Sequence, residues 1–140
     1  MSSENANVLL VLAWLEAWGR GDAEAVVGAL DPAVEIHSPQ EVGNAGTFRG
    51  VAGYREWEGL WMEAWEDFQN EILRAEPVGQ RHVVVDARQR GRGRGSGVEV
   101  DREVSMLCEI RDGRLVRFHI YSTHERALAV ARQGDAGVAN

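Results

Sequence analysis

The sequence predicts an α+β fold, in which helices pack on one face of a curved, mostly antiparallel sheet and form a cone. Two observations predict it. Apolar residues recur at helical spacing in the first half of the chain and alternate with polar residues after Trp65. The alternating segments also follow one another through short turns, and strands joined in this way pair as an antiparallel meander. The open end of such a cone is a natural pocket.

The first half of the chain predicts three helices and one strand. Apolar residues at helical spacing over residues 8–18 predict a first helix, which Gly19 and Gly21 end. Asp22 is suited to cap a second, short helix that stops at Pro32. Residues 34–37 alternate and predict a short strand, and a polar loop follows as far as Gly50.

A third helix is predicted over residues 51–65, and its aromatic stripe has two interpretations. Tyr54, Trp57, Trp61 and Trp65 recur along one side of this helix. Such a stripe is most often the packing face of a helix. It also suits an aromatic wall against a flat, ring-shaped ligand, and the two interpretations can hold for different ends of the helix.

The second half of the chain predicts four strands in series and a closing helix. The strands are expected over residues 68–73, 82–90, 98–110 and 114–121, with turns at residues 77–79, 93–97 and 111–113. The glycine-arginine run at residues 91–97 passes from strand to strand, so we interpret it as a hairpin connection rather than as a phosphate loop. A helix begins at His124, and the tail from Gln133 is expected to be frayed.

The turn of the last hairpin decides which side chains face the interior. A two-residue turn at Asp112 and Gly113 would pair Ile110 with Leu115, whereas a type I turn followed by a bulge at Gly113 would pair Ile110 with Arg114. A shift of one residue moves every side chain to the opposite face, and the bulged register separates apolar from polar residues more cleanly. We therefore predict the bulged register. The predicted interior set is Val104, Met106, Cys108, Ile110, Val116, Phe118 and Ile120, and the predicted outer set is Glu103, Ser105, Leu107, Glu109, Leu115, Arg117, His119 and Tyr121.

Length and composition indicate one domain over residues 1–140, with an ordered core over 5–132 and a tail over 133–140. The net charge of −7 argues against nucleic acid and anionic membranes as partners. A single cysteine, Cys108, excludes an intramolecular disulfide and fits a cytoplasmic location. No positive charge precedes the apolar run over residues 8–12, so we expect neither a signal peptide nor a membrane span.

The best polar candidates in the first half of the chain are His37 and Ser38, at the end of the predicted strand. A histidine exchanges protons near neutral pH, and a serine hydroxyl can orient a substrate oxygen. The plain alternative for His37 is a hydrogen-bonded histidine with a structural role. His119, His124 and Glu125 have no convincing fourth partner for a metal, and we predict no metal site and no cofactor.

Four segments together resemble the SnoaL-like branch of the nuclear-transport-factor-2-like superfamily. They are residues 17–22 (AWGRGD), 31–39 (DPAVEIHSP), 48–50 (FRG) and 111–116 (RDGRLV), and the resemblance covers nearly the whole chain. It implies a cone-shaped α+β barrel of three to four helices on a strongly curved sheet, frequently dimeric through the outer face of the sheet. Its members include polyketide cyclases, ketosteroid isomerases, limonene epoxide hydrolases and ligand-binding domains without known activity.

The resemblance also shows where this chain departs from the enzymes of the family. Trp14 stands where ketosteroid isomerases have a tyrosine, Ser38 where they have the general-base aspartate, and Met106 where they have a protonated aspartate. Ile120 matches the acid-base aspartate of SnoaL-type cyclases. Serine cannot act as a carboxylate base at neutral pH and a thioether donates no proton, so these substitutions argue against both mechanisms.

Two functions remain open on the sequence. The first is a protein that binds a hydrophobic, ring-containing small molecule, either without catalysis or as a cofactor-independent enzyme of cyclase or isomerase type in which His37 and Ser38 do the chemistry. The predicted ligand-binding residues are Trp14, Trp57, Trp61, Met106, Cys108, Phe118 and Ile120. The second is a non-catalytic module for ligand sensing or for dimerisation through the outer face of the sheet.

Overall fold

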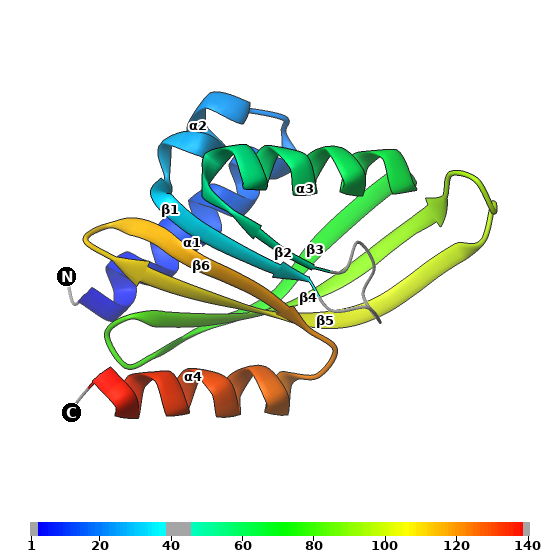
Figure 1. Cartoon of the computed structure of the whole chain (residues 1–140). Helices are drawn as coiled ribbons and strands as arrows, with labels where there is room; N and C mark the ends of the chain where they lie inside the picture. The colour runs from blue at the N-terminus through cyan, green and yellow to red at the C-terminus, as the bar shows by residue number, and fades with distance from the viewer. Residues whose placement is uncertain (1–2, 39–45, 139–140) are drawn as a thin grey trace.

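A computed structural model describes residues 3–38 and 46–138 of the chain, and in that part four helices surround one six-stranded sheet (Figure 1). The sheet has the strand order β2-β1-β6-β5-β4-β3. This arrangement confirms the predicted α+β fold. The elements in chain order are α1 (Ser3–Gly19), α2 (Ala23–Gly28), β1 (Leu30–Ser38), β2 (Gly46–Arg49), α3 (Gly50–Ala64), β3 (Trp65–Val78), β4 (His82–Gly93), β5 (Glu99–Arg111), β6 (Arg114–Tyr121) and α4 (His124–Val138).

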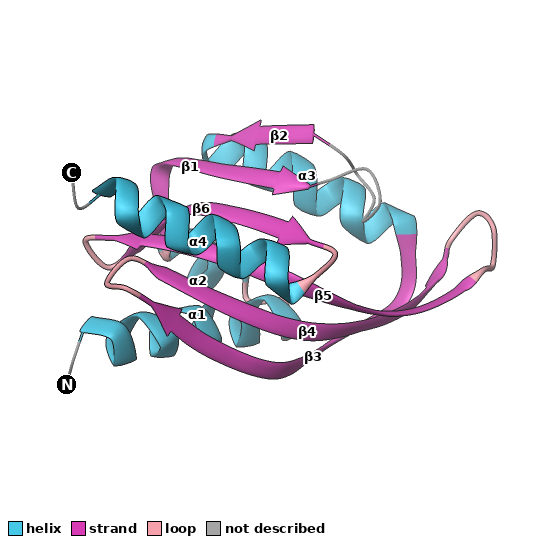
Figure 2. Cartoon of the chain, turned by 90° about the horizontal axis from the view of Figure 1, so that it is seen from below, coloured by secondary structure: helices cyan, strands magenta, loops and turns pink. Residues whose placement is uncertain are grey.

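The four strands β3 to β6 form the antiparallel meander that the sequence predicts. Strand β1 joins this meander by pairing parallel to β6, and β2 pairs antiparallel to β1 at the edge. Helices α1, α2 and α3 lie on the inner face of the curved sheet, whereas α4 lies across its outer face (Figures 1 and 2). No helix in the described ranges combines the length and the hydropathy that a membrane span needs.

Three elements differ from the sequence prediction, one because it is new and two because they are longer. Strand β2 lies where a loop was predicted, because its residues pair with the edge of β1 from Glu35 to Ser38 and not because of any pattern of their own. Strand β3 begins already at Trp65, directly after α3. Helix α4 continues past Gln133 to Val138, in the segment predicted to be frayed.

The core inside the cone is built largely from aromatic side chains of α1 and α3 and from apolar side chains of the meander. Tyr54, Trp57 and Trp61 of α3 are almost completely buried, so the stripe forms the packing face of the helix. Val83, Val85 and Ala87 of β4 face them from the sheet. A second, smaller cluster lies under α4 and contains Val84, Leu107, Ala127 and Ala131.

The turn of the last hairpin differs from the prediction, although the interior set largely agrees with it. Asp112 and Gly113 both have positive φ, 53° and 73°, and Ile110 pairs with Leu115, so the predicted turn was wrong. The bulge instead lies after Leu115, where the register shifts between Glu109 and Ile110. Leu115 is therefore buried in the core, and Val116, predicted to face inward, is not part of it.

The displaced bulge restores the predicted parity over the rest of the hairpin. Cys108 pairs with Phe118 and Met106 with Ile120, and all four are buried in the inner core. The shift follows from tertiary contact, because the Leu115 N–H donates a hydrogen bond of 2.9 Å to the carbonyl of Ala29 and ties the start of β6 to the end of α2. Met106 and Ile120, which by the resemblance match acid-bearing positions of the family's enzymes, therefore face the interior.

Candidate functional site

A groove of about 920 Å³ is lined by residues of α1 and its connection to α2, of the second half of α3 and of the start of β3. Its walls combine apolar side chains with acidic and basic ones. The lining residues are Leu12, Leu15, Glu16, Trp18, Gly19, Arg20, Gly21, Asp22, Ala23, Val26, Glu58, Met62, Trp65, Asp67, Phe68, Gln69, Asn70, Ile72 and Arg94. A groove of this size accommodates a small organic molecule.

A bulge at the start of β3 shapes the floor of the groove. Asp67 has a φ of 52°, and the pairing of β3 with β4 shifts between Glu66 and Gln69. This bulge turns Phe68 toward the helices, where its ring meets Trp18 edge-on with centroids 5.7 Å apart. Gly91 of β4 makes room for this packing, since a Cβ there would lie 3.1 Å from the Trp65 ring.

A small inner cavity of about 20 Å³ lies directly behind the groove. Leu15, Trp18, Phe68 and Asn70 line both spaces, so the cavity is the inward continuation of the groove. Its other lining residues are Trp14, Trp57, Trp61, Gln89, Met106, Phe118 and Ile120. The cavity is large enough for one water molecule or one small chemical group, and too small for a ring.

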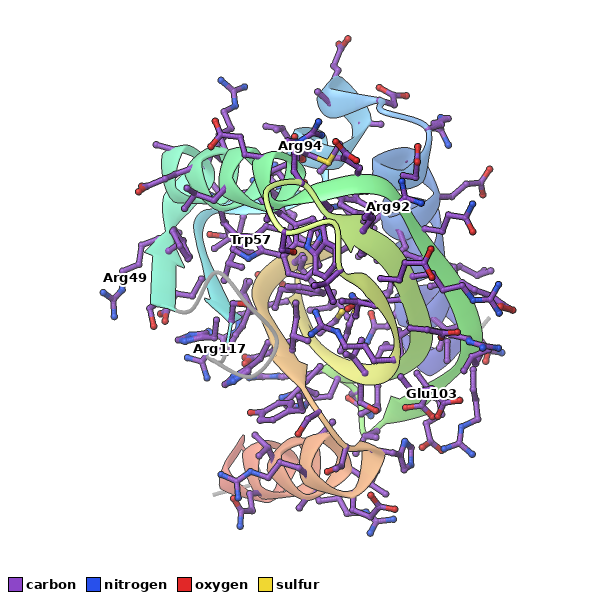
Figure 3. The ribbon with its side chains drawn as sticks, turned by 90° about the vertical axis from the view of Figure 1, so that its right-hand side faces the viewer. Arg49, Trp57, Arg92, Arg94, Glu103 and Arg117 are labelled. Carbon is purple, nitrogen blue, oxygen red and sulfur yellow. The ribbon has the colours of Figure 1, made fainter. Side chains whose placement is uncertain are left out.

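Aromatic packing fills the remainder of the cone. The Phe118 ring lies 5.3 Å from the Trp14 ring and 5.9 Å from the Trp57 ring, centroid to centroid. Figure 3 shows Trp57 pointing into the space that the curled sheet encloses. The indole nitrogens of Trp14, Trp57 and Trp61 are buried and have no hydrogen-bond partner among the described residues. A ring-shaped ligand therefore finds room in the groove and not in the centre of the cone.

Three polar side chains lie side by side on neighbouring strands, on the inner face of the sheet next to the cavity. Asn70 of β3 pairs in register with Gln89 of β4, which pairs with Arg102 of β5. The Arg102 Nε–H donates a hydrogen bond of 3.3 Å to Gln89 Oε1, and the guanidinium lies over the Trp65 ring at 5.6 Å. The Asn70 Oδ1 atom is buried and accepts no hydrogen bond from any described residue. Burial lowers the pKa of Arg102.

Helix α3 brings a carboxylate to the wall of the groove. The hydroxyl of the buried Tyr54 donates a hydrogen bond of 2.5 Å to Glu58 Oε2, one turn further along α3. Burial, together with this hydrogen bond and the charge of Glu58, raises the pKa of Tyr54, so the phenol stays protonated and acts as a donor. Glu58 is thereby held in place, while its side chain contributes to the groove lining.

Most of the predicted ligand-binding residues lie around the inner cavity. Trp14, Trp57, Trp61, Met106, Phe118 and Ile120 all line it. Cys108 does not, because its side chain is packed into the core on the neighbouring part of β5. Burial raises the pKa of Cys108 to about 12, so the thiol stays protonated and unreactive at neutral pH.

His37 and Ser38, the predicted catalytic pair, point to opposite faces of β1. Val34, Ile36 and Ser38 are buried on the inner face, so His37 projects from the outer face of the sheet, away from the groove. Ser38 is buried at the end of β1 and lines neither the groove nor the inner cavity. The structure thus does not bring these two side chains together at one site.

His37 instead joins His119 and Tyr121 in a row on the outer face, where His119 and Tyr121 were predicted to lie. The rings of His37 and His119 stack at 5.0 Å, and those of His119 and Tyr121 at 4.0 Å. Glu35 Oε1 lies 3.1 Å from His37 Nε2, and Thr47 Oγ1 lies 3.1 Å from His37 Nδ1. Burial, the neighbouring His37 and the charges of Arg117 and Arg126 lower the pKa of His119 to about 4.

A polar cluster on the outer face fastens the start of α4 to the sheet. Asp86 Oδ1 accepts hydrogen bonds from Ser105 Oγ at 2.6 Å and from His124 Nδ1 at 2.9 Å, and Arg74 Nη2 lies 3.1 Å from Asp86 Oδ2. Burial raises the pKa of Asp86, but these hydrogen bonds and the charge of Arg74 outweigh it and leave the pKa below its ordinary value. Serine and histidine both bond to the aspartate, so this is not the arrangement of a hydrolytic triad.

No group of three or more histidine, cysteine, aspartate or glutamate side chains within residues 3–38 and 46–138 is arranged to hold a metal ion.

Sequence reasoning missed the groove itself and the polar groups that serve it. Asn70, Gln89 and the pair of Tyr54 with Glu58 were not among the candidates. The spacing of Tyr54 and Glu58, four residues apart in a predicted helix, is the signal that could have found this pair. Alternation over residues 68–73 places Phe68 and Asn70 on one face, but it does not say that this face meets α1.

The chain has the cone-shaped fold of nuclear-transport-factor-2-like domains. The model of the SnoaL-like domain family matches residues 11–118, which is most of the chain. The chain therefore belongs to the SnoaL-like domain family. Its sequence matches no curated protein.

Solved structures with low sequence identity share the fold. The structure of Bal32a from a soil-derived mobile gene cassette is 19% identical with a TM-score of 0.78, covering 90% of this chain and 95% of that one. The structure of TerC co-crystallised with polyporic acid is 19% identical with a TM-score of 0.73, covering 90% and 98%. An NTF2-like protein from Burkholderia xenovorans LB400 is 23% identical with a TM-score of 0.73, covering 92% and 97%.

Proposed function

We propose that the chain binds a hydrophobic, ring-containing small molecule in the groove between α1, α3 and β3. The observation that carries this proposal is the groove of about 920 Å³, with Trp18 and Phe68 at its floor and a small cavity behind them. Aromatic side chains bordering an open groove present flat apolar surface to a ring. Similarity of fold to TerC supports a small organic ligand, because TerC was co-crystallised with polyporic acid.

The charges around the groove favour a ligand without a negative charge. Glu16, Asp22, Glu58 and Asp67 contribute four carboxylates to its lining, against the two cations Arg20 and Arg94. Arg20 lies 3.2 Å from Asp22, and Arg94 lies 3.8 Å from Glu66. The remaining acidic side chains, together with the net charge of −7, disfavour the approach of an anion.

Isothermal titration calorimetry with two matched variants of α3 tests the proposal. Met62 is 53% exposed and lines the groove, whereas Leu60 is 41% exposed on the same helix and does not line it. With 2-naphthol as the probe, Met62→Arg is expected to weaken binding about tenfold by placing a long charged side chain in the groove. Leu60→Arg adds the same charge outside it and is expected to leave the affinity unchanged. Absence of binding, or equal loss in both variants, contradicts the proposal.

A second candidate function is cofactor-independent proton transfer on the bound ligand. The specific observation in its favour is Glu58, a carboxylate on the groove wall that Tyr54 holds in position by a hydrogen bond of 2.5 Å. A carboxylate can remove a proton next to a ligand carbonyl and return it to another carbon, as cyclases and isomerases require. The geometry favours Glu58 for this role over His37, which lies on the opposite face of the sheet.

Hydrogen exchange of an enolisable ring ketone tests this second candidate. In deuterated water, a base exchanges the α-hydrogens of 2-tetralone in two steps. It first removes an α-proton, which leaves the enolate, and a deuteron is then added to the same carbon. The native chain is expected to accelerate the exchange, Glu58→Gln to abolish the acceleration, and His37→Gln to leave it unchanged. Loss of acceleration in His37→Gln alone assigns the chemistry to His37 instead. If 2-tetralone binds but its exchange is not accelerated, the second candidate is contradicted and a non-catalytic, ligand-sensing role is favoured.

The predicted homodimer through the outer face of the sheet stays a prediction. Helix α4 packs on that face against Val84 and Leu107, and so occupies part of the surface that such a dimer needs. The part over β1 and β6 carries His37 and His119. Light scattering of the purified chain measures the mass directly, and a monomeric mass at all concentrations tested contradicts the dimer.

A further inference from the structure

Asn70 stands at the junction between the groove and the inner cavity. Its side chain lines both spaces, together with Leu15, Trp18 and Phe68, which are apolar or aromatic. The Asn70 Oδ1 atom is buried without a hydrogen-bond partner among the described residues. A buried carboxamide oxygen without a donor carries an energetic cost, which a donor from a bound molecule removes.

Gln89 supplies a second carboxamide beside Asn70, and Arg102 fixes its orientation. Gln89 is 4% exposed, lines the inner cavity and lies opposite Asn70 in the pairing of β3 with β4. A guanidinium only donates hydrogen bonds. The atom of Gln89 that lies 3.3 Å from Arg102 Nε is therefore its carboxamide oxygen, Oε1. The amide nitrogen of Gln89 is therefore the end turned away from Arg102.

The size of the inner cavity limits what can reach these groups. A cavity of about 20 Å³ holds a single small group such as a hydroxyl, and the rings of Trp14, Trp57 and Phe118 close it on the inner side. Among its lining side chains, Asn70 and Gln89 are the carboxamides, and the others are aromatic, aliphatic or a thioether. The acidic lining of the groove in front of it disfavours a carboxylate at this position.

We propose that the inner cavity is a hydroxyl subsite, so that the preferred ligand is a neutral hydroxylated ring compound of phenol or enol type. The ring lies in the groove over Trp18 and Phe68, and its hydroxyl enters the cavity and donates a hydrogen bond to Asn70 Oδ1. This inference rests on the proposed ligand-binding function and names the chemical class of the ligand.

Two probes of nearly equal shape separate the hydroxyl from the ring. 2-Naphthol and 2-methylnaphthalene differ by a hydroxyl in place of a methyl group, and equilibrium dialysis measures the affinity of each for the native chain. The proposal predicts that 2-naphthol binds about tenfold more tightly, since only the hydroxyl pairs with Asn70 Oδ1. Equal affinities overturn the hydroxyl subsite but leave the ring-binding function intact. Absence of binding for both probes defeats the proposed function as well.

A variant of similar volume then assigns the preference to Asn70. Asn70→Leu is expected to bind both probes equally, at the affinity of the native chain for 2-methylnaphthalene. Gln80→Leu makes the same chemical change in the exposed turn between β3 and β4 and is expected to keep the preference. Should Asn70→Leu fail to fold, as circular dichroism would reveal, Asn70→Ala takes its place. A preference for 2-naphthol that persists in a folded Asn70 variant contradicts the assignment.

Discussion

The indole of Trp14 and the ring of Phe118 meet edge to face in the middle of the cone, with their centroids 5.3 Å apart. Trp14 stands where the isomerases of this fold, by the resemblance stated above, have a hydrogen-bond-donating tyrosine. Here the position serves packing, because Trp14 is 5% exposed and its indole nitrogen has no partner among the described residues. On the proposed function, a ligand is therefore expected to bind in the groove and not at the position of that tyrosine.

Phe118→Ala is expected to destabilise the fold by about 3–5 kcal/mol, because it removes a ring that packs against both Trp14 and Trp57. Urea unfolding followed by tryptophan fluorescence measures the change. The variant is also expected to gain stability in the presence of benzene, which fits the enlarged cavity. Leu73→Ala, at a side chain that is 46% exposed, is the control with a small effect. A loss below about 1 kcal/mol for Phe118→Ala contradicts the tight packing described here.

Tyr54→Phe is expected to cost about 1–2 kcal/mol, because it deletes the hydroxyl that donates to Glu58 while keeping the buried ring. The free energy of unfolding in urea measures this loss. In the double variant with Glu58→Leu, whose side chain has no acceptor for the hydroxyl, the two losses are expected not to add, since each change removes the same hydrogen bond. Full additivity shows that the pair is not coupled.

The pH dependence of stability reports on His119, whose pKa lies at about 4 in the folded chain and at 6.5 ordinarily. At a pH between these two pKa values, His119 is protonated in the unfolded chain and neutral in the folded chain. Stability is therefore complete above pH 6.5 and falls as the pH drops toward 4. His119→Gln is expected to flatten this dependence in urea unfolding at pH 7.5, 5.5 and 4.5. If the free energy of unfolding of His119→Gln depends on pH as steeply as that of the native chain, His119 does not cause the loss of stability at low pH.

Gly113→Ala is expected to lower stability by about 1 kcal/mol, because Gly113 has a φ of 73° and alanine is strained there. Gly95→Ala, in the turn between β4 and β5, is the control, since Gly95 has no positive φ and open space around it. Thermal unfolding compares the two variants. Equal melting temperatures for both variants contradict the two-residue turn at Asp112 and Gly113.

The interior of the last hairpin was predictable because apolar residues alternate there and burial enforces one parity. Met106, Cys108, Phe118 and Ile120 face inward as the sequence predicts. The position of the bulge was not predictable, because the bond between the Leu115 N–H and the Ala29 carbonyl depends on contact with α2. The bulge lies after Leu115 instead of at Gly113, so Leu115 takes the place of Val116 in the interior while the rest of the predicted interior set is unchanged.

The candidate site was predictable only in part. The tryptophans of α3 and the inward residues of β5 and β6 follow from periodicity, and they form the back wall of the inner cavity. The groove joins Trp18 of α1 to Phe68 and Asn70 of β3, far apart in sequence, through a bulge at Asp67 that no local pattern specifies. For His37 the sequence did hold the signal, since Val34 and Ile36 facing inward place His37 outward.

Chemical-shift mapping of the backbone amides during a titration with 2-naphthol tests the ligand-binding groove most directly. Binding in the groove predicts that the largest shifts arise at Leu15, Trp18, Phe68 and Asn70, which line both the groove and the inner cavity. The chemical shifts of the His37 and His119 amides, on the outer face of the sheet, are expected not to change. Shifts confined to His37, His119 and their neighbours, or no shifts at saturating ligand, contradict a ligand site in the groove.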